Sequence, residues 1–300
     1  MSTATKRPGV TLVEILVVIG ILGLLMGLLL PAVQGVRGRA SQMRCLDNVR
    51  QIGLAMHNYE SAHGTLPPAQ TKVEKNYINW MVTLLPYIEQ DDLYRRTVEA
   101  SRLDPSRFND PPHIGLKTVI RTYICPADGR LTSPITDDQG YTAAYSSYMG
   151  MTGGMIKLPT THDQGGIMTG TSGSGVRLTD ITDGTSQTVA VGERTPPGRL
   201  FVGSWYNPGT LFLAWDFDGY ERGMSMGALK SYNEGRCRGP FPFGPGRIEN
   251  PCDSNHFWSL HPGGANFLFA DGSVRFLSYS AAAILPALAT RAGGEVINWP

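Results

Sequence analysis

Residues 8–33 read PGVTLVEILVVIGILGLLMGLLLPAV, and this stretch decides most of what the sequence predicts about the fold. From Ile15 to Leu30 it contains no charged and no polar side chain. A helix from Val10 to Leu30 would be about 31 Å long at about 1.5 Å per residue, which is enough to cross the hydrocarbon core of a bilayer. The stretch therefore predicts a transmembrane helix over residues 10–33.

Two simpler kinds of segment share this hydropathy. A secretory signal peptide has an apolar run of roughly 7–15 residues that ends at a small-residue cleavage site. The run here is longer and continues into a helical pattern, which argues against a signal peptide. Hydropathy alone leaves a plain signal anchor open as the alternative.

Glu14 distinguishes this segment from a plain anchor, because a carboxylate inside a membrane helix costs on the order of 3 kcal/mol on insertion scales. It follows a short polar leader in which Lys6 and Arg7 precede Pro8 and Gly9. An ionisable residue at this position indicates a function and requires a partner.

The run from Gly9 to Glu14 resembles the prepilin peptidase recognition motif of type IV pilins and type II secretion pseudopilins. The resemblance implies a leader over residues 1–9, cleavage between Gly9 and Val10, and methylation of the new terminal residue Val10. Glu14 would then be residue five of the mature chain, and Pro31 would be residue 22, where pilin helices often have proline. Val10 departs from the family pattern, in which Phe is commonest.

The same resemblance implies the partners of the segment. These are a prepilin peptidase, the membrane, and like or related pilin-type subunits. In an assembly, the amino group of Val10 on one subunit is expected to pair with Glu14 of its neighbour. Pro31 removes an intrahelical donor and is expected to kink the helix.

The charges that flank the apolar run point to the opposite topology when they are simply counted. Lys6 and Arg7 precede the run, and four arginines follow it, namely Arg37, Arg39, Arg44 and Arg50. Long domains translocate largely regardless of such counts, however, and the leader must reach a cytoplasmic-side peptidase in the family. We therefore expect a single-pass inner-membrane protein with a cytoplasmic leader and residues 34–300 in the periplasm or at the cell surface.

After Pro31 the apolar pattern becomes periodic. Apolar side chains recur every three or four positions from Val36 to Tyr59, which predicts an amphipathic helix over residues 34–64. Gly64 and the Pro67-Pro68 pair end the pattern. We expect one long helix, docked by its second half on an exoplasmic globular domain of residues 65–300.

Three further runs carry a closer resemblance. They are CLDNVRQIGLAMHNY (residues 45–59), DITDGTS (180–186) with Val191-Gly192-Glu193, and a terminal block in which His261 is followed after nine residues by Asp271-Gly272. Together they resemble a large planctomycete family that joins a prepilin segment to an uncharacterised secreted domain.

Composition describes the domain in broad terms. The chain has 36 Gly and 21 Pro, and only 17% of its residues are charged, which is typical of a loop-rich domain with strands. The net charge of +1 gives no pull towards nucleic acid. We expect an α+β fold whose sheets are mainly antiparallel. Residues 80–96 are expected to be helical and interrupted by Pro86, and strands are expected at 119–125, 189–192 and 211–215.

The clearest local pattern is a hairpin over residues 265–277. Two short apolar runs flank Asp271-Gly272, the pair that favours a two-residue type I′ turn with positive φ at both positions. This turn accounts for both residues without a catalytic role.

The four cysteines are Cys45, Cys125, Cys237 and Cys252, and no pair has C-x-x-C spacing. An even number in an exoplasmic domain favours disulfides. Of the three possible connectivities we favour Cys45–Cys125 with Cys237–Cys252, and the alternative is that one or both pairs are free.

The sequence predicts that the domain is not an enzyme. His261 with Asp253 and Asp271 suggests a hydrolase constellation, but no Gly-x-Ser-x-Gly elbow, Walker loop or zinc-protease motif accompanies it. His261 is instead expected to hydrogen-bond a hairpin or loop.

The sequence establishes no cofactor, and calcium is the one candidate that it offers. Asp180 and Asp183 offer clustered oxygen ligands, and the major pseudopilins that the chain resembles carry a calcium site. The spacing differs from an EF-hand loop, and Asp-Gly-Thr-Ser is equally typical of a turn.

The sequence thus predicts a membrane-anchored, pilin-like structural subunit that assembles through its N-terminal helix. The alternative is a membrane-tethered binding protein, at the surface or in the periplasm, that never polymerises.

Overall fold

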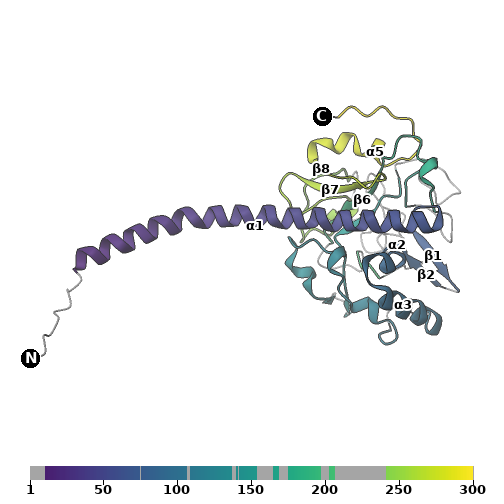
Figure 1. The fold of residues 1–300 in the computed structure, drawn as a ribbon, viewed down its shortest axis with the longest axis horizontal. Helices are drawn as coiled ribbons and strands as arrows, with labels where there is room; N and C mark the ends of the chain where they lie inside the picture. Colours follow the sequence, from purple (N-terminus) through teal and green to yellow (C-terminus); the bar gives the residue numbers. More distant parts are fainter. Residues whose placement is uncertain are drawn as a thin grey trace, which may run out of the picture. The chain divides into compact units, whose positions relative to one another are not determined.

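The computed structural model describes residues 11–74, 76–106, 109–136, 140, 142–153, 165–168, 175–196, 203–206 and 241–299. The chain forms two compact units, Met1–Ser41 and Gln42–Pro300. A long apolar helix is followed by a mixed domain with small antiparallel sheets (Figure 1), so the predicted α+β class is confirmed.

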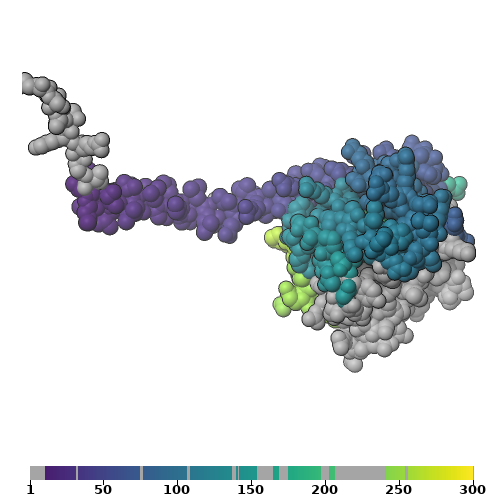
Figure 2. Space-filling view, turned by 90° about the horizontal axis from the view of Figure 1, so that it is seen from below, coloured from purple at the N-terminus to yellow at the C-terminus, as the bar shows by residue number. Residues whose placement is uncertain are grey.

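The long helix is α1, Leu12–His63. Within the first unit, the described side chains of α1 are almost all exposed (Figure 2). An 18-residue window of α1 has a mean hydropathy of 2.8. Such a segment is long and apolar enough to span a bilayer. Pro31 lies inside α1, which stays helical on both sides of it, so the proline causes no break in the helix.

Gly64 ends α1, as the sequence predicts. Its φ is +73°, a left-handed conformation that glycine adopts without steric cost, and its N–H donates to the carbonyl of Glu60 at 2.7 Å.

In the second unit, α1 has one buried face. Its buried residues recur at helical spacing, namely Cys45, Val49, Ile52, Ala55 and Met56, whereas Met43 and Leu54 are exposed. In Figure 1 this part of α1 runs between the strands β6–β8 and the helices α2 and α3. Leu268 of β7 packs against Gly53, where an added Cβ would lie 2.7 Å from Leu268 Cδ1. The predicted docking of an amphipathic helix is therefore confirmed within this unit.

Residues 80–96 form a helical segment that is interrupted at Pro86, as predicted. It comprises α2 (Trp80–Thr83), the 3₁₀ helix η1 (Leu85–Ile88) that contains Pro86, and α3 (Asp91–Leu103). The side chain of Asn79 caps α2 by accepting from the Val82 N–H at 3.0 Å.

The principal sheet has four antiparallel strands in the order β5-β6-β7-β8. They are β5 (Tyr148–Gly150), β6 (Val189–Glu193), β7 (Gly264–Phe269) and β8 (Val274–Ser278). β6 confirms the strand expected at 189–192. The strand expected at 211–215 lies outside the described residues.

Short elements complete the domain. Two hairpins pair β1 (Gln70–Val73) with β2 (Asn76–Asn79) and β3 (Ile135–Thr136) with β4 (Thr142–Ala143). Among the described residues, the remaining helices are η2 (Ile114–Lys117), η3 (Arg121–Tyr123), η4 (Gly129–Thr132), η5 (Leu178–Asp180), η7 (Pro251–Asn255), η8 (Tyr279–Ala283) and α5 (Leu285–Leu288).

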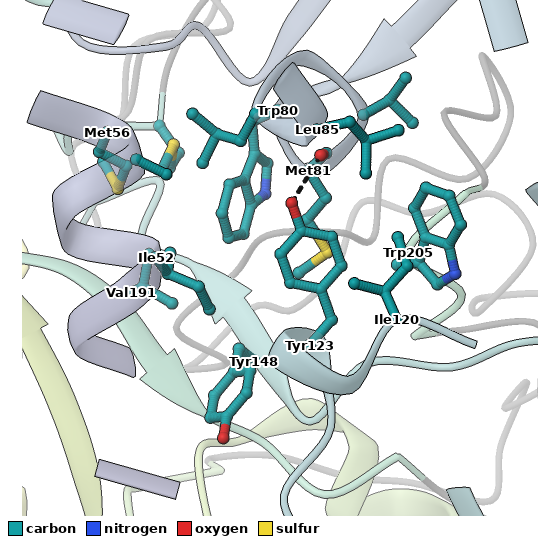
Figure 3. Packing of buried hydrophobic residues seen from close by; sticks show 14 of the residues in the cluster. Ile52, Met56, Trp80, Met81, Leu85, Ile120, Tyr123, Tyr148, Val191 and Trp205 are labelled. Carbon is teal, nitrogen blue, oxygen red and sulfur yellow. Dashed lines mark hydrogen bonds between the residues drawn. The ribbon is translucent and has the colours of Figure 1, made fainter. Parts of the chain in front are cut away.

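The strand expected at 119–125 is wrong, because η3 occupies this segment. Ile120, Tyr123 and Ile124 are all buried, and their i, i+3, i+4 spacing is that of a helical turn rather than a strand. The Tyr123 hydroxyl also reaches across the core and donates to the carbonyl of Met81 at 2.7 Å (Figure 3).

The hairpin between β7 and β8 is confirmed, but its turn type is not the predicted one. Gly272 has φ +82°, whereas Asp271 has no positive φ. The Gly272 N–H donates to the Phe269 carbonyl at 2.9 Å, and the Phe269 N–H donates to the Ser273 carbonyl at 2.9 Å. This is the three-residue loop in which a turn precedes a left-handed glycine, not a two-residue type I′ turn.

Replacing Gly272 by alanine is expected to lower the free energy of unfolding by about 1–2 kcal/mol. The backbone at Gly272 has φ +82°, a conformation in which a residue with a side chain is strained. An added Cβ would also lie 3.2 Å from His57 Nε2. Chemical denaturation of the detergent-solubilised protein measures the effect. Gly129→Ala is the matched control, since nothing lies within 4 Å of its Cβ position, and equal losses in both variants would contradict this account.

Candidate functional site

The N-terminal motif is described from Thr11 onward, and Gly9 and Val10 lie outside the described residues. The backbone N–H and the hydroxyl of Thr11 both donate to Glu14 Oε2 at 2.8 Å. The Glu14 N–H in turn donates to Thr11 Oγ1 at 3.3 Å. Since α1 begins at Leu12, this is a reciprocal capping box at the start of the helix.

The capping box gives Glu14 a partner within its own chain, which the sequence-based interpretation missed. The signal was present, because Thr11-Leu12-Val13-Glu14 has the Ser/Thr-x-x-Glu pattern that begins helices. Both bonds from Thr11 end on Oε2, and none of the described residues donates to Oε1. The carboxylate is thus oriented by its own helix while one oxygen remains available.

A second candidate site lies inside the second unit, and we call its four residues the disulfide cluster: Cys45, Cys125, Glu193 and His261. Each comes from a different segment: α1, the loop after η3, the end of β6, and the loop before β7. All four are buried. Among the described residues, they are the only group of three or more Cys, His, Asp or Glu side chains whose ligand atoms converge.

The predicted Cys45–Cys125 disulfide is confirmed. Its surroundings hold it on both sides, because the Tyr148 hydroxyl donates to the Cys45 carbonyl at 3.3 Å and the Cys125 N–H donates to Ser147 Oγ at 2.8 Å. Cys237 lies outside the described residues, so the Cys237–Cys252 pair stays a prediction.

Glu193 and His261 lie beside the disulfide. His261 Nε2 is 3.4 Å from Cys125 Sγ and 3.5 Å from Glu193 Oε1, and the two residues are only 4% and 2% exposed. Asn266 holds the other carboxylate oxygen, since its backbone N–H and its side-chain amide donate to Glu193 Oε2 at 2.7 and 3.1 Å. Such donors offset the free-energy cost of removing a carboxylate from water.

The charge of Glu193 in the cluster also affects the ionisation of the nearby Tyr148 phenol. Burial, and secondly the Glu193 carboxylate, raise the pKa of the Tyr148 phenol well above its ordinary value. A small pocket adjoins the cluster, and its polar lining includes Cys125, Glu193, Ser147 and Asp128. The cluster is thus a buried polar centre beside a small pocket whose lining includes Cys125 and Glu193.

The three side chains of the hydrolase constellation, which no sequence motif supports, have other hydrogen-bond partners. Asp271 accepts from the Ser273 N–H at 2.9 Å in the hairpin turn. Asp253 accepts from Arg247 and Asn250 and lies 3.4 Å from His256. His261 is in the disulfide cluster, so the three side chains are tied to three different places.

The terminal block therefore divides into two parts. His261 contributes to the disulfide cluster, whereas Asp271 and Gly272 form the hairpin turn. The turn also docks on the neighbouring loop, because the Ala270 N–H donates to Thr188 O at 2.8 Å and the Asp271 N–H donates to Thr185 O at 3.1 Å.

Asp180 and Asp183 both bond protein donors. Hydrogen bonds from Arg177, first from its side chain and then from its backbone, hold the pKa of Asp180 below its usual range. Asp183 accepts from the N–H groups of Gly293 and Gly294 at 2.7 and 2.9 Å. These bonds give both carboxylates structural roles, and calcium at this position stays a prediction.

Comparison with known protein families finds two matches. The family described as "Protein of unknown function (DUF1559)" matches residues 34–283, and the family described as "Prokaryotic N-terminal methylation motif" matches residues 5–30. The first match includes the whole disulfide cluster, and the second includes Gly9, Val10 and Glu14. No curated protein and no solved structure matches the chain.

Proposed function

Because the chain belongs to the DUF1559 family and begins with an N-terminal methylation motif, we propose that it is a membrane-anchored, pilin- or pseudopilin-like structural subunit that assembles through α1. The observation that carries this proposal is the overlap of that motif, residues 5–30, with a helix apolar enough to span a membrane. The motif and the apolar helix together indicate a membrane-anchored, pilin-like protein processed by a prepilin peptidase.

The first step in the proposed role is processing. The peptidase cleaves the bond between Gly9 and Val10 on the cytoplasmic side of the inner membrane, and the new amino group of Val10 is methylated. The domain of residues 34–300 lies outside the cytoplasm, in the periplasm or at the cell surface. Its role is structural and non-enzymatic, in an assembly of the type II secretion or type IV pilus kind.

The second step is assembly. The capping box fixes Glu14 at the first turn of α1 through Oε2, so Oε1 can accept from the amino group of Val10 on a neighbouring subunit. That ion pair offsets the cost of about 3 kcal/mol for a carboxylate in the bilayer. Gly20, Gly23 and Gly27 have open space at their Cβ positions, which lets a neighbouring helix approach closely.

Kinship with the planctomycete family is part of the same proposal. The runs that suggest it, residues 45–59, 180–193 and 261–272, all fall within the DUF1559 match. A calcium site at Asp180 and Asp183 would be a further feature that this chain shares with the major pseudopilins.

Glu14→Ala is expected to remove most of the higher-order species that crosslinking or surface shearing detects. The variant removes the only carboxylate in the span, so the neighbour's amino group loses its partner. Immunoblots of crosslinked membranes, with wild type and variant at equal abundance, measure the effect.

Two control variants separate assembly from folding. Thr11→Val removes the capping hydroxyl but keeps the carboxylate, and Glu60→Ala removes an acid elsewhere on α1; both are expected to assemble. Crosslinks that persist unchanged in Glu14→Ala would favour the alternative, a tethered surface or periplasmic binding protein that does not polymerise. Equal losses in Thr11→Val and Glu14→Ala would reduce the role of Glu14 to helix capping.

A further inference from the structure

The disulfide cluster brings four metal-binding side chains to one buried place. The ligand atoms of Cys45, Cys125, Glu193 and His261 all lie within 4.8 Å of one another. The four residues are separated in sequence, and the packing of α1, η3, β6 and β7 brings them together. A disulfide alone requires neither a buried carboxylate nor a buried imidazole beside it.

The donor set and its spacing suit zinc. Two thiolates, one imidazole nitrogen and one carboxylate oxygen are all ligands that Zn²⁺ takes in four-coordinate tetrahedral sites. Donor atoms about 2.0–2.3 Å from such an ion are about 3.3–3.8 Å from one another. The distances from His261 Nε2 to Cys125 Sγ and to Glu193 Oε1, 3.4 and 3.5 Å, fall in this range.

An independent observation comes from the hydrogen bonds of Glu193. Its Oε1 is fully buried, and none of the described residues gives it a hydrogen bond. Its Oε2 is held by both donors of Asn266, so the unbonded oxygen has a fixed direction towards His261 and the sulfurs. A carboxylate oriented in this way by an outer partner is typical of a metal ligand.

A small pocket adjoins two of the four residues of the disulfide cluster. The pocket beside the cluster is lined by Cys125 and Glu193, and Asp128 and Ser147 add oxygen atoms to its wall. An ion in this pocket would therefore already contact two of the four ligands.

We propose that the disulfide cluster is a redox-gated metal site, which binds one zinc-like divalent cation through Cys45, Cys125, Glu193 and His261 when the disulfide is reduced. A dithiol supplies two electrons and two protons, and it becomes a cyclic disulfide while Cys45 and Cys125 become thiols. Binding of Zn²⁺ then releases the two thiol protons to solvent. In the reverse direction a small-molecule disulfide accepts two electrons from the Cys45 and Cys125 thiolates and two protons from solvent and becomes a dithiol, while the Cys45–Cys125 bond re-forms and the ion is released.

The test uses the full chain in detergent, reduced with a dithiol and then equilibrated anaerobically with Zn²⁺ or Co²⁺. The reduced protein is expected to bind one ion in this site, with the thiolate-to-cobalt absorption and the visible bands of a tetrahedral Co²⁺ complex. The oxidised protein is expected to show neither. Glu193→Gln and His261→Gln should each weaken the affinity by more than the roughly 10–100-fold that loss of an outer partner costs.

The matched control is His256→Gln, because His256 is also buried but lies beside Asp253 and near Cys252 in sequence. It should bind zinc as the wild type does, and a loss in this variant would place the ion near Cys252 instead. Circular dichroism of every sample monitors the fold. The proposal is overturned by a reduced protein that binds no ion, by unchanged affinity in both Glu193→Gln and His261→Gln, or by equal binding in the oxidised protein.

Discussion

Replacing Cys45 and Cys125 together by serine is expected to lower the free energy of unfolding of the second unit by about 4 kcal/mol. The bond joins residues 80 positions apart, so it restricts a long loop in the unfolded chain. The chain-entropy model gives about 3 kcal/mol for a 15-residue loop and about 4.7 kcal/mol for a 100-residue loop. Denaturant unfolding of the detergent-solubilised protein, with a metal chelator present, measures the difference.

The corresponding double alanine variant is the control for this measurement. Both cysteines are buried, so serine adds the cost of burying two hydroxyl groups to the loss of the crosslink. Alanine adds a small cavity instead, and the two variants should agree within about 1–2 kcal/mol. A loss below about 1 kcal/mol in both would mean that the bond does not stabilise the domain.

Ile52→Ala is expected to lower the free energy of unfolding by about 2–5 kcal/mol. Ile52 is completely buried in the core that Figure 3 shows, among Met56, Trp80 and Val191. Removing its side chain loses burial of apolar surface and leaves a cavity that the surroundings fill only in part. Chemical denaturation at several denaturant concentrations gives the value.

Leu54 provides a matched control on the same helix, because it lies two residues further along and is 66% exposed. Leu54→Ala is expected to change the free energy of unfolding by no more than about 0.5 kcal/mol. Equal losses of stability in the two variants would show that packing of the Ile52 face of α1 does not stabilise the domain.

The long helix and its docked face could be predicted from the sequence because the underlying signals extend over many residues. The apolar run, the periodic pattern after Pro31 and the stop at Gly64 agree with one another, and α1 ends at His63. Shorter signals were less decisive. Residues 119–125 are rich in β-branched side chains, but the buried side chains sit at helical spacing. The segment contains a 3₁₀ turn, and the Tyr123 hydroxyl in it donates to the Met81 carbonyl.

The turn type of the β7–β8 hairpin could not be predicted from the turn residues alone. Asp-Gly between apolar runs favours a two-residue turn, yet here the N–H groups of Ala270 and Asp271 bond the loop of residues 185–188. Those bonds suit a three-residue turn with only Gly272 left-handed. The position of the hairpin was predictable, and its conformation depended on a neighbour far away in sequence.

The disulfide cluster was predictable only in part. The even cysteine count favoured disulfides, with Cys45–Cys125 in the preferred one of three connectivities, and the terminal block singled out His261. Glu193 was missed as a site residue, because a single Glu after a short apolar strand has no pattern that reveals its burial. Only the pairing of β6 with β7 brings it to Asn266 and His261.

The proposed function depends above all on the N-terminal segment being a processed prepilin signal. Intact mass measurement and N-terminal sequencing of the protein extracted from membranes test this most directly. We expect a chain that begins at Val10 and carries one methyl group on its amino terminus. A membrane-bound chain that still begins at Met1 would contradict it.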